Sequence, residues 1–129
     1  MPPDPTAEAR TWLAQATEDL TAARHLATNP DMPPRLAAFL AHLAAEKAMQ
    51  AALIARGVAI RRIHDLVALQ ASLADDDAAA LSSEDVDLLV PWNIAGRYPA
   101  DLDAEPELAI SAVAASERIV GALTKRILG

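Results

Sequence analysis

The sequence contains no cysteine, few aromatic residues and no excess of basic side chains. Without cysteine, the chain has neither a disulfide framework nor a thiolate that could serve as a metal ligand or nucleophile. Lys and Arg number 11 against 18 Asp and Glu, so the net charge is -7. This balance argues against a broad phosphate-binding surface, which needs basic side chains to displace counterions, but it is compatible with a local basic pocket.

Long hydrophobic runs are also missing. No stretch approaches the roughly 20 apolar residues that a membrane span requires. The N-terminal "MPPDPTAEAR" lacks the basic and apolar segments of a secretory signal. We therefore expect a cytoplasmic protein with no membrane partner.

Hydrophobic residues, by contrast, make up 53% of the 129 residues, which is enough for one sizeable core. The apolar positions recur at intervals of three and four, and no convincing length alternates with a period of two. The sequence therefore predicts a single all-α domain over residues 1–129, built as an up-and-down bundle of four to five helices.

Prolines and capping residues predict where the first two helices begin and end. Residues 1–5 read as a Pro-rich lead-in, and Thr6 is a suitable N-cap for a helix that runs to about Ala27. The second helix is expected to start at Pro33 and Pro34 and to end at Gly57. Its predicted apolar stripe consists of Leu36, Phe39, Leu40, Leu43, Leu53 and Ile54.

Shorter helices are predicted for the rest of the chain. Asp65 is expected to cap a third helix that ends near Ala74, and the acidic "DDDAAALSSED" is expected to be a solvated loop. Ser82 or Ser83 then caps a fourth helix, which Pro91 kinks or divides. Pro106 suits the first turn of a long fifth helix.

A polar stripe interrupts the second helix. Its members are spaced by four and share one face, with Lys47 beside them: His42, Glu46 and Gln50. One interpretation is an ordinary solvated face. The other is that the stripe faces the loops that hold His64 and Arg97, so that Glu46 or Lys47 joins them by charge pairing. Sequence spacing does not decide between these interpretations.

Three motifs follow one another along the chain: Ala-Glu-Lys-Ala at 45–48, His-Asp-Leu at 64–66 and Arg-Tyr-Pro at 97–99. In this order and spacing, from about Trp12 to Leu123, the chain resembles the HEPN (higher eukaryotes and prokaryotes nucleotide-binding) domain of prokaryotes. It departs from the pattern at Gly96, where Ala is commoner, and at Gln50, where a second Lys is frequent.

The resemblance implies a helical bundle, often a homodimer, frequently paired with a small nucleotidyltransferase made by a neighbouring gene. Many relatives in such pairs are toxins that cut RNA. That activity is tied to an Arg followed four to six residues later by a His, which contact the scissile phosphate and transfer a proton. No His follows Arg97, and Asp101 and Asp103 would repel a phosphate there. The pair Arg35 and His42 matches the spacing, but it starts the second helix and reads as accidental.

Six residues are therefore the candidates for a nucleotide- or anion-binding site: Glu46, Lys47, His64, Asp65, Arg97 and Tyr98. Arg61 and Arg62 lie in the same region. The alternative roles are structural: Asp65 caps a helix beside a packed His64, and Arg97 closes the fourth helix. Trp12 and Trp92 fit a core or an interface better than a base-stacking platform.

No phosphate-cradling glycine loop, metal-ligand cluster or hydrolase triad occurs, so we expect no catalytic residue, metal or cofactor. Three hypotheses stay open. The favoured one is a dimeric module that binds a nucleotide or anion and pairs with a nucleotidyltransferase. The others are a ribonuclease toxin with a degenerate site and a helical assembly module without a ligand. The first requires Arg97 and His64 to lie close to Glu46 or Lys47.

Overall fold

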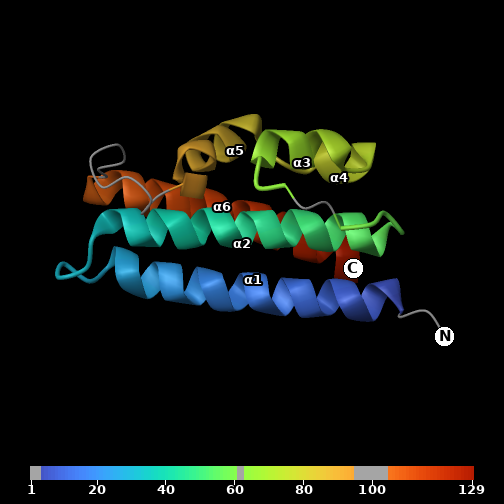
Figure 1. Ribbon diagram of the computed structural model, residues 1–129, viewed down its shortest axis with the longest axis horizontal. Coiled ribbons are helices and arrows are strands. Elements are labelled where there is room, and N and C mark those ends of the chain that lie inside the picture. The colour runs from blue at the N-terminus through green and yellow to red at the C-terminus, as the bar shows by residue number, and fades with distance from the viewer. Residues whose placement is uncertain (1–3, 61–62, 95–104) are drawn as a thin grey trace.

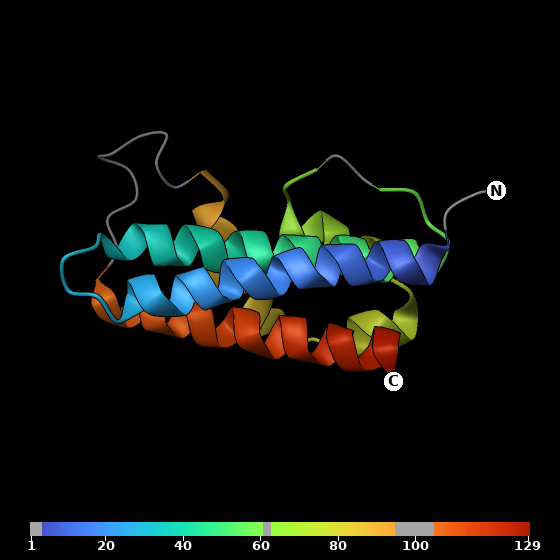
Figure 2. The same cartoon turned by 90° about the horizontal axis from the view of Figure 1, so that it is seen from below.

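The computed structural model describes residues 4–60, 63–94 and 105–129, and three long helices form its frame. They are α1 (Pro5–Ala27), α2 (Pro34–Ala55) and α6 (Pro106–Leu128). Figures 1 and 2 show the three helices side by side, with α1 antiparallel to α2. No strand occurs in the described ranges, so the predicted all-α fold is confirmed.

Proline stands in the first turn of each long helix, as the sequence predicted for α2 and α6. The start of α1 differs from the prediction in its cap. Asp4, not Thr6, is the N-cap, and its carboxylate accepts a hydrogen bond from the Thr6 N–H at 3.0 Å. The Pro-rich lead-in is therefore shorter than residues 1–5, because Pro5 has a fixed φ that suits the first helical position.

A second layer returns the chain from α2 to the start of α6. It consists of α3 (Leu66–Ser72), α4 (Asp75–Ala79), α5 (Ser83–Leu89) and the 3₁₀ helix η1 (Val90–Ile94). In Figure 1 this layer lies along one side of α2 and α6. The bundle keeps the predicted up-and-down order, but the chain between α2 and α6 is divided into several short helices. The break predicted at Pro91 is the change from α to 3₁₀ geometry at Val90.

The helix α2 lies in the middle of the molecule and contacts α1, α6 and the second layer. Its fully buried positions are mostly small: Ala37, Ala38, Ala41, Ala44, Ala45, Ala48, Ala51 and Ala52. The predicted stripe is buried at Leu53 and Ile54, but Leu36, Phe39, Leu40 and Leu43 are only half-buried. Alanine faces the neighbouring helices because it allows their backbones to approach closely.

The acidic stretch that was expected to be a solvated loop contains α4. Asp77, inside α4, is fully buried, whereas Asp75 and Asp76 are exposed. Its carboxylate pairs with Arg56 at the end of α2 and Arg126 near the end of α6. The expectation is wrong at this position because two guanidinium groups from distant parts of the chain replace the solvent around one carboxylate.

Candidate functional site

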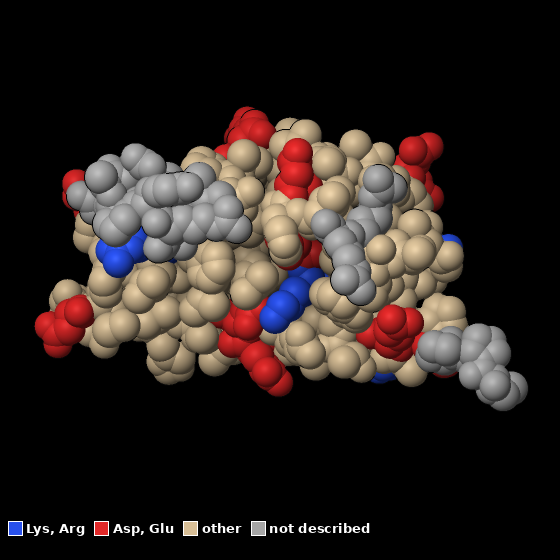
Figure 3. Space-filling model, viewed as in Figure 1, with Lys and Arg blue, Asp and Glu red and all other residues tan. Residues whose placement is uncertain are grey.

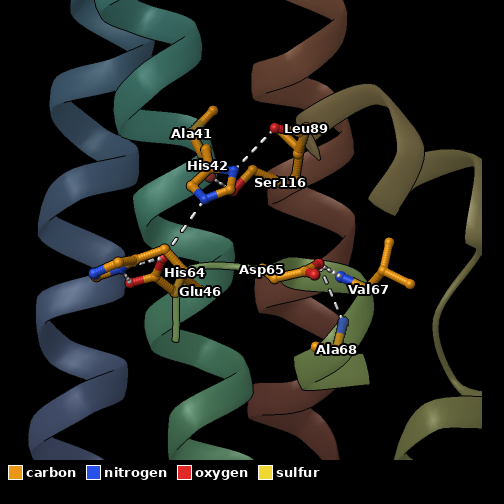
Figure 4. Close-up of polar contacts among 9 residues, drawn as sticks. All are labelled: Ala41, His42, Glu46, His64, Asp65, Val67, Ala68, Leu89 and Ser116. Carbon is orange, nitrogen blue, oxygen red and sulfur yellow. Dashed lines mark hydrogen bonds and ion pairs between the residues drawn. The ribbon is translucent and has the colours of Figure 1, made fainter. Parts of the chain in front are cut away.

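The candidate site is centred on Glu46, which lies halfway along α2 with its side chain 10% exposed. The segment that precedes α3 brings His64 to it. Nδ1 of His64 lies 3.0 Å from Oε1 and 3.1 Å from Oε2 of Glu46. Figure 4 shows the imidazole and the carboxylate facing each other. Two of the predicted site residues, 18 positions apart, therefore meet.

A second histidine approaches Glu46 from the buried side. His42, one helical turn earlier and 2% exposed, places Nε2 3.5 Å from Oε1 of Glu46. Its other nitrogen, Nδ1, lies 2.9 Å from the Leu89 carbonyl oxygen at the end of α5. A carbonyl oxygen only accepts, so Nδ1 of His42 carries a proton and donates it. We call His42, Glu46 and His64 the histidine–glutamate array.

The pKa of Glu46 reflects these surroundings. Burial by itself raises the pKa, because a carboxylate loses hydration in the protein interior. Hydrogen bonds from His42 and His64, together with the charges that these rings carry when protonated, act in the opposite direction and outweigh burial. The pKa of Glu46 therefore lies below its ordinary value of 4.5, and the group is a carboxylate at neutral pH.

The ionised carboxylate determines which nitrogen of His64 faces the solvent as an acceptor. Because a carboxylate only accepts hydrogen bonds, Nδ1 of His64 must donate. In the neutral imidazole the lone pair then resides on Nε2, on the side of the ring away from Glu46. The His64 side chain is 74% exposed. The array thus presents an imidazole of fixed tautomer at the surface.

Asp65 has the structural role that the sequence offered as its alternative. It is the N-cap of α3, and its Oδ1 accepts the N–H groups of Val67 and Ala68 at 3.0 and 3.2 Å. These bonds fix the chain direction immediately after His64. Asp65 therefore supports the site by shaping its backbone, and its carboxylate is engaged by the helix.

Lys47 is not joined to the array by an ion pair within the described residues. Its Nζ lies 2.8 Å from Oδ2 of Asp19 on α1. The adjacent position Glu46 faces the segment that holds His64. One residue further along, the helix has rotated by about 100°, and Lys47 points toward α1. The sequence offered Glu46 and Lys47 as charged partners of His64. Of these two, the structure places only Glu46 in contact with His64.

The polar stripe on α2 is not a solvated face. Its three members are 2%, 8% and 3% exposed: His42, Glu46 and Gln50. The second interpretation, in which the stripe faces the loop that holds His64, is correct for Glu46, because this residue contacts His64. Sequence reasoning missed His42 as a member of the array. The spacing of four residues between His42 and Glu46 could have indicated their contact. The second partner of His42 is the backbone carbonyl of Leu89, and a pattern of side chains does not predict such a contact.

Several candidates lie outside the described residues: Arg61, Arg62, Arg97, Tyr98, Asp101 and Asp103. The expected approach of Arg97 to His64 stays a prediction. The formal Arg35 and His42 pair is further weakened, because His42 is buried and both of its nitrogens face protein groups. Trp92 is buried, as expected, while Trp12 is half-buried.

The wider surface agrees with the acidic composition. On the face shown in Figure 3, the basic side chains of the described residues are few and separated, and acidic groups lie both at the margin and in the middle of the face. Among the described residues no group of three or more His, Asp or Glu side chains is arranged to hold a metal ion. None of the described helices is both long and apolar enough to cross a membrane. The cytoplasmic location stays a prediction.

Comparison with known proteins relates this geometry to a family. The chain is similar to TT1696 from Thermus thermophilus, with 26% identity over 92% of this chain and 97% of that one, and a TM-score of 0.77. It shares its fold with ST0689, described as an archaeal HEPN homologue, at 22% identity over the same shares and a TM-score of 0.69. A search of curated proteins finds no match. The family model described as HEPN domain matches residues 9–127, and the chain therefore belongs to the HEPN domain family.

Proposed function

We propose that this HEPN-domain protein is a homodimeric binding module without catalytic activity of its own, and that the surface around Glu46 and His64 receives a nucleotide or a related anionic ligand. The observation that carries the proposal is the exposed imidazole of His64, held by a buried carboxylate. A nucleotide suits it because Nε2 of the neutral ring accepts from a hydroxyl or amino group, and the protonated ring donates to a phosphate. Lys47, Arg97 and Tyr98 are proposed to complete the site.

Nucleotide binding can be tested directly by calorimetry with ATP, GTP and their monophosphates. We expect His64→Asn to weaken binding about five- to 30-fold, because one hydrogen bond to a charged or polar ligand group is worth about 1–2 kcal/mol. The matched control is His25→Asn, since His25 is also exposed but lies on α1. Equal affinities for wild type and His64→Asn, or no binding by wild type, would refute this site.

An RNA cleavage assay separates this proposal from the ribonuclease alternative. We expect the purified protein to leave single-stranded RNA intact, because no His follows Arg97. Such a His would supply the proton transfer that raises a reaction rate by about two to four orders of magnitude. The assay compares wild type with Arg97→Ala. Cleavage by wild type that disappears in Arg97→Ala would establish the toxin hypothesis in its place.

A protein partner is the third part of the proposal. We expect a neighbouring gene to encode a small protein with the Gly-Ser and paired-aspartate signature of a nucleotidyltransferase. Co-expression followed by size-exclusion chromatography tests whether the two proteins elute together. Separate elution at micromolar concentration would favour the plain helical assembly module.

A further inference from the structure

The three histidines of the chain have different surroundings, and only one of them is both exposed and held by a carboxylate. His42 is buried against Leu89 and Glu46. His25 is exposed, and its ring makes no hydrogen bond within the described part of the chain. His64 is 74% exposed and bonded through Nδ1 to Glu46. The chain therefore contains its own reference histidine for any reaction at His64.

An imidazole reacts as a nucleophile through the nitrogen that carries the lone pair. In solution the two neutral tautomers exchange, and each nitrogen is the nucleophile for part of the time. Glu46 selects the tautomer with its proton on Nδ1, so the lone pair of His64 is held on Nε2, away from Glu46. A buried carboxylate on the opposite nitrogen also stabilises the positive charge that develops on the ring as Nε2 forms a bond.

The carboxylate is itself held in place. Glu46 is buried on α2, and Nε2 of His42 lies 3.5 Å from its Oε1, the oxygen that His64 also contacts. His42 is anchored in turn by the Leu89 carbonyl oxygen at 2.9 Å. The neighbouring carboxylate of Asp65 is engaged by the amide groups of α3, and the His64 side chain is 74% exposed.

We propose that Nε2 of His64 is a phosphoryl acceptor, modified by donors of the phosphoramidate class, which includes a phosphohistidine on another protein. The Nε2 lone pair forms the new bond to phosphorus while the phosphorus–nitrogen bond of the donor breaks. The bonding electrons leave with the donor nitrogen, which departs as ammonia from phosphoramidate protonated on its nitrogen, or as a neutral imidazole from a phosphohistidine whose ring is protonated. Nδ1 keeps its proton throughout, and the cationic phosphohistidine ring remains paired with Glu46.

Potassium phosphoramidate, a small donor that needs no enzyme, provides the test. The intact protein is incubated with it at neutral pH, and the mass gain of one phosphoryl group is followed over time. Fragmentation that preserves the phosphorus–nitrogen bond assigns the modified histidine, and ³¹P NMR distinguishes attachment at Nε2 from attachment at Nδ1. We expect His64 to be modified at Nε2, about ten times faster than His25.

Three variants separate the role of the array from simple exposure. His64→Asn should remove the fast modification, and His25→Asn should leave it unchanged. Glu46→Gln should slow modification of His64 by about tenfold to 100-fold, the range found when the group that orients a metal-bound imidazole is removed. Circular dichroism confirms that each variant is folded. In urea, which unfolds the array, wild-type His25 and His64 should react at equal rates.

Equal rates at His25 and His64 in the folded protein would overturn the proposal. So would an unchanged rate in folded Glu46→Gln, or attachment at Nδ1 of His64. The urea comparison keeps the test decisive even if Glu46→Gln does not fold. The outcome is independent of the nucleotide-binding proposal, because calorimetry measures that binding in the absence of any phosphoryl donor.

Discussion

At the level of single residues, Asp77 illustrates how one carboxylate connects distant parts of the chain. Its side chain is 1% exposed and accepts hydrogen bonds from Nε and Nη2 of Arg56, both at 2.9 Å, and from Nε of Arg126 at 3.1 Å. The hydrogen bonds from Arg56 are the main reason why the pKa of Asp77 lies below its ordinary value, and Arg126 adds to them while burial opposes. Asp77 thereby links α4 to the ends of α2 and α6.

We expect Asp77→Asn to destabilise the fold by about 1–3 kcal/mol. The substitution keeps the size of the side chain but removes its charge between two guanidinium groups. Loss of one partner from a buried ion pair costs more, about 3–5 kcal/mol, but Arg56 and Arg126 are 37% and 40% exposed, so solvent screens part of the effect. The measurement is urea unfolding followed by circular dichroism.

Asp76→Asn is the matched control. Asp76 precedes Asp77 in the same helix, is 89% exposed and reaches Arg126 only at 4.0 Å. Exposed pairs of this kind contribute about 0–1 kcal/mol. Equal losses of stability in Asp76→Asn and Asp77→Asn would show that α4 is not anchored by its buried carboxylate.

The same carboxylates predict how stability depends on pH. The folded pKa values of Glu46 and Asp77 lie below their ordinary values of 4.5 and 3.8, so both groups stabilise the folded state above those values. This contribution is lost as the pH falls through the lower folded pKa values. The stabilisation that these two carboxylates provide should therefore begin to fall below about pH 4.5. The difference between wild type and Asp77→Asn should shrink below pH 3.8, and a difference that grows there would contradict the assignment.

The residues of the site were predictable to different degrees. Glu46 and His64 were identified from the polar stripe and from the His-Asp-Leu motif, and the structure brings them into contact. The partner of Lys47 was not predictable, since Asp19 belongs to another helix and no spacing relates the two. Which groups meet across helices depends on helix rotation, and that is determined by packing of the whole bundle rather than by local sequence.

At the level of elements, the alanines of α2 determine how closely its neighbours approach. The close contact between α2 and α6 is visible at Ser116, whose hydroxyl donates to the Ala41 carbonyl oxygen at 2.7 Å. Ser116 on α6 is fully buried. Ala45 and Ala48, one turn apart on α2, are fully buried as well. Because interiors are closely packed, we expect a longer side chain at these buried positions to push the helices apart.

Ala48→Leu should destabilise the protein by about 1–3 kcal/mol or more, the usual cost of inserting methylene groups into a packed interior. Ala14→Leu is the control, because Ala14 lies on the exposed side of α1 and leucine is also a good helix former. Thermal unfolding compares the two. If Ala48→Leu were as stable as Ala14→Leu, the interior around α2 would be loosely packed.

The long elements were predicted well, and the second layer less well, for a physical reason. Proline at the start of a helix and glycine after its end act locally, so α2 and α6 could be located from sequence. Within the acidic stretch, local signals indicate solvent, and only the approach of Arg56 and Arg126 makes burial of Asp77 favourable. A helix of five residues depends on such contacts because it is too short to be stable alone.

At the level of the whole molecule, the predicted homodimer follows from the small side chains of the interior. Alanine buries little area per residue, so burial between two copies is an additional source of stability. Apolar side chains are available at the surface of the second layer, where Val67, Leu88 and Val90 are 50%, 38% and 36% exposed. Light scattering at micromolar concentration should give twice the mass of 13.6 kDa. A mass of 13.6 kDa itself would contradict this prediction.

The central position of α2 has a consequence for the motions of the protein. It contacts α1, α6 and the second layer, so we expect the middle of this helix to be the last part to open. Hydrogen–deuterium exchange there must wait for the entire molecule to unfold, whereas α3, α4 and α5 can detach while the long helices remain together. We therefore expect the slowest-exchanging amides between Ala41 and Leu53.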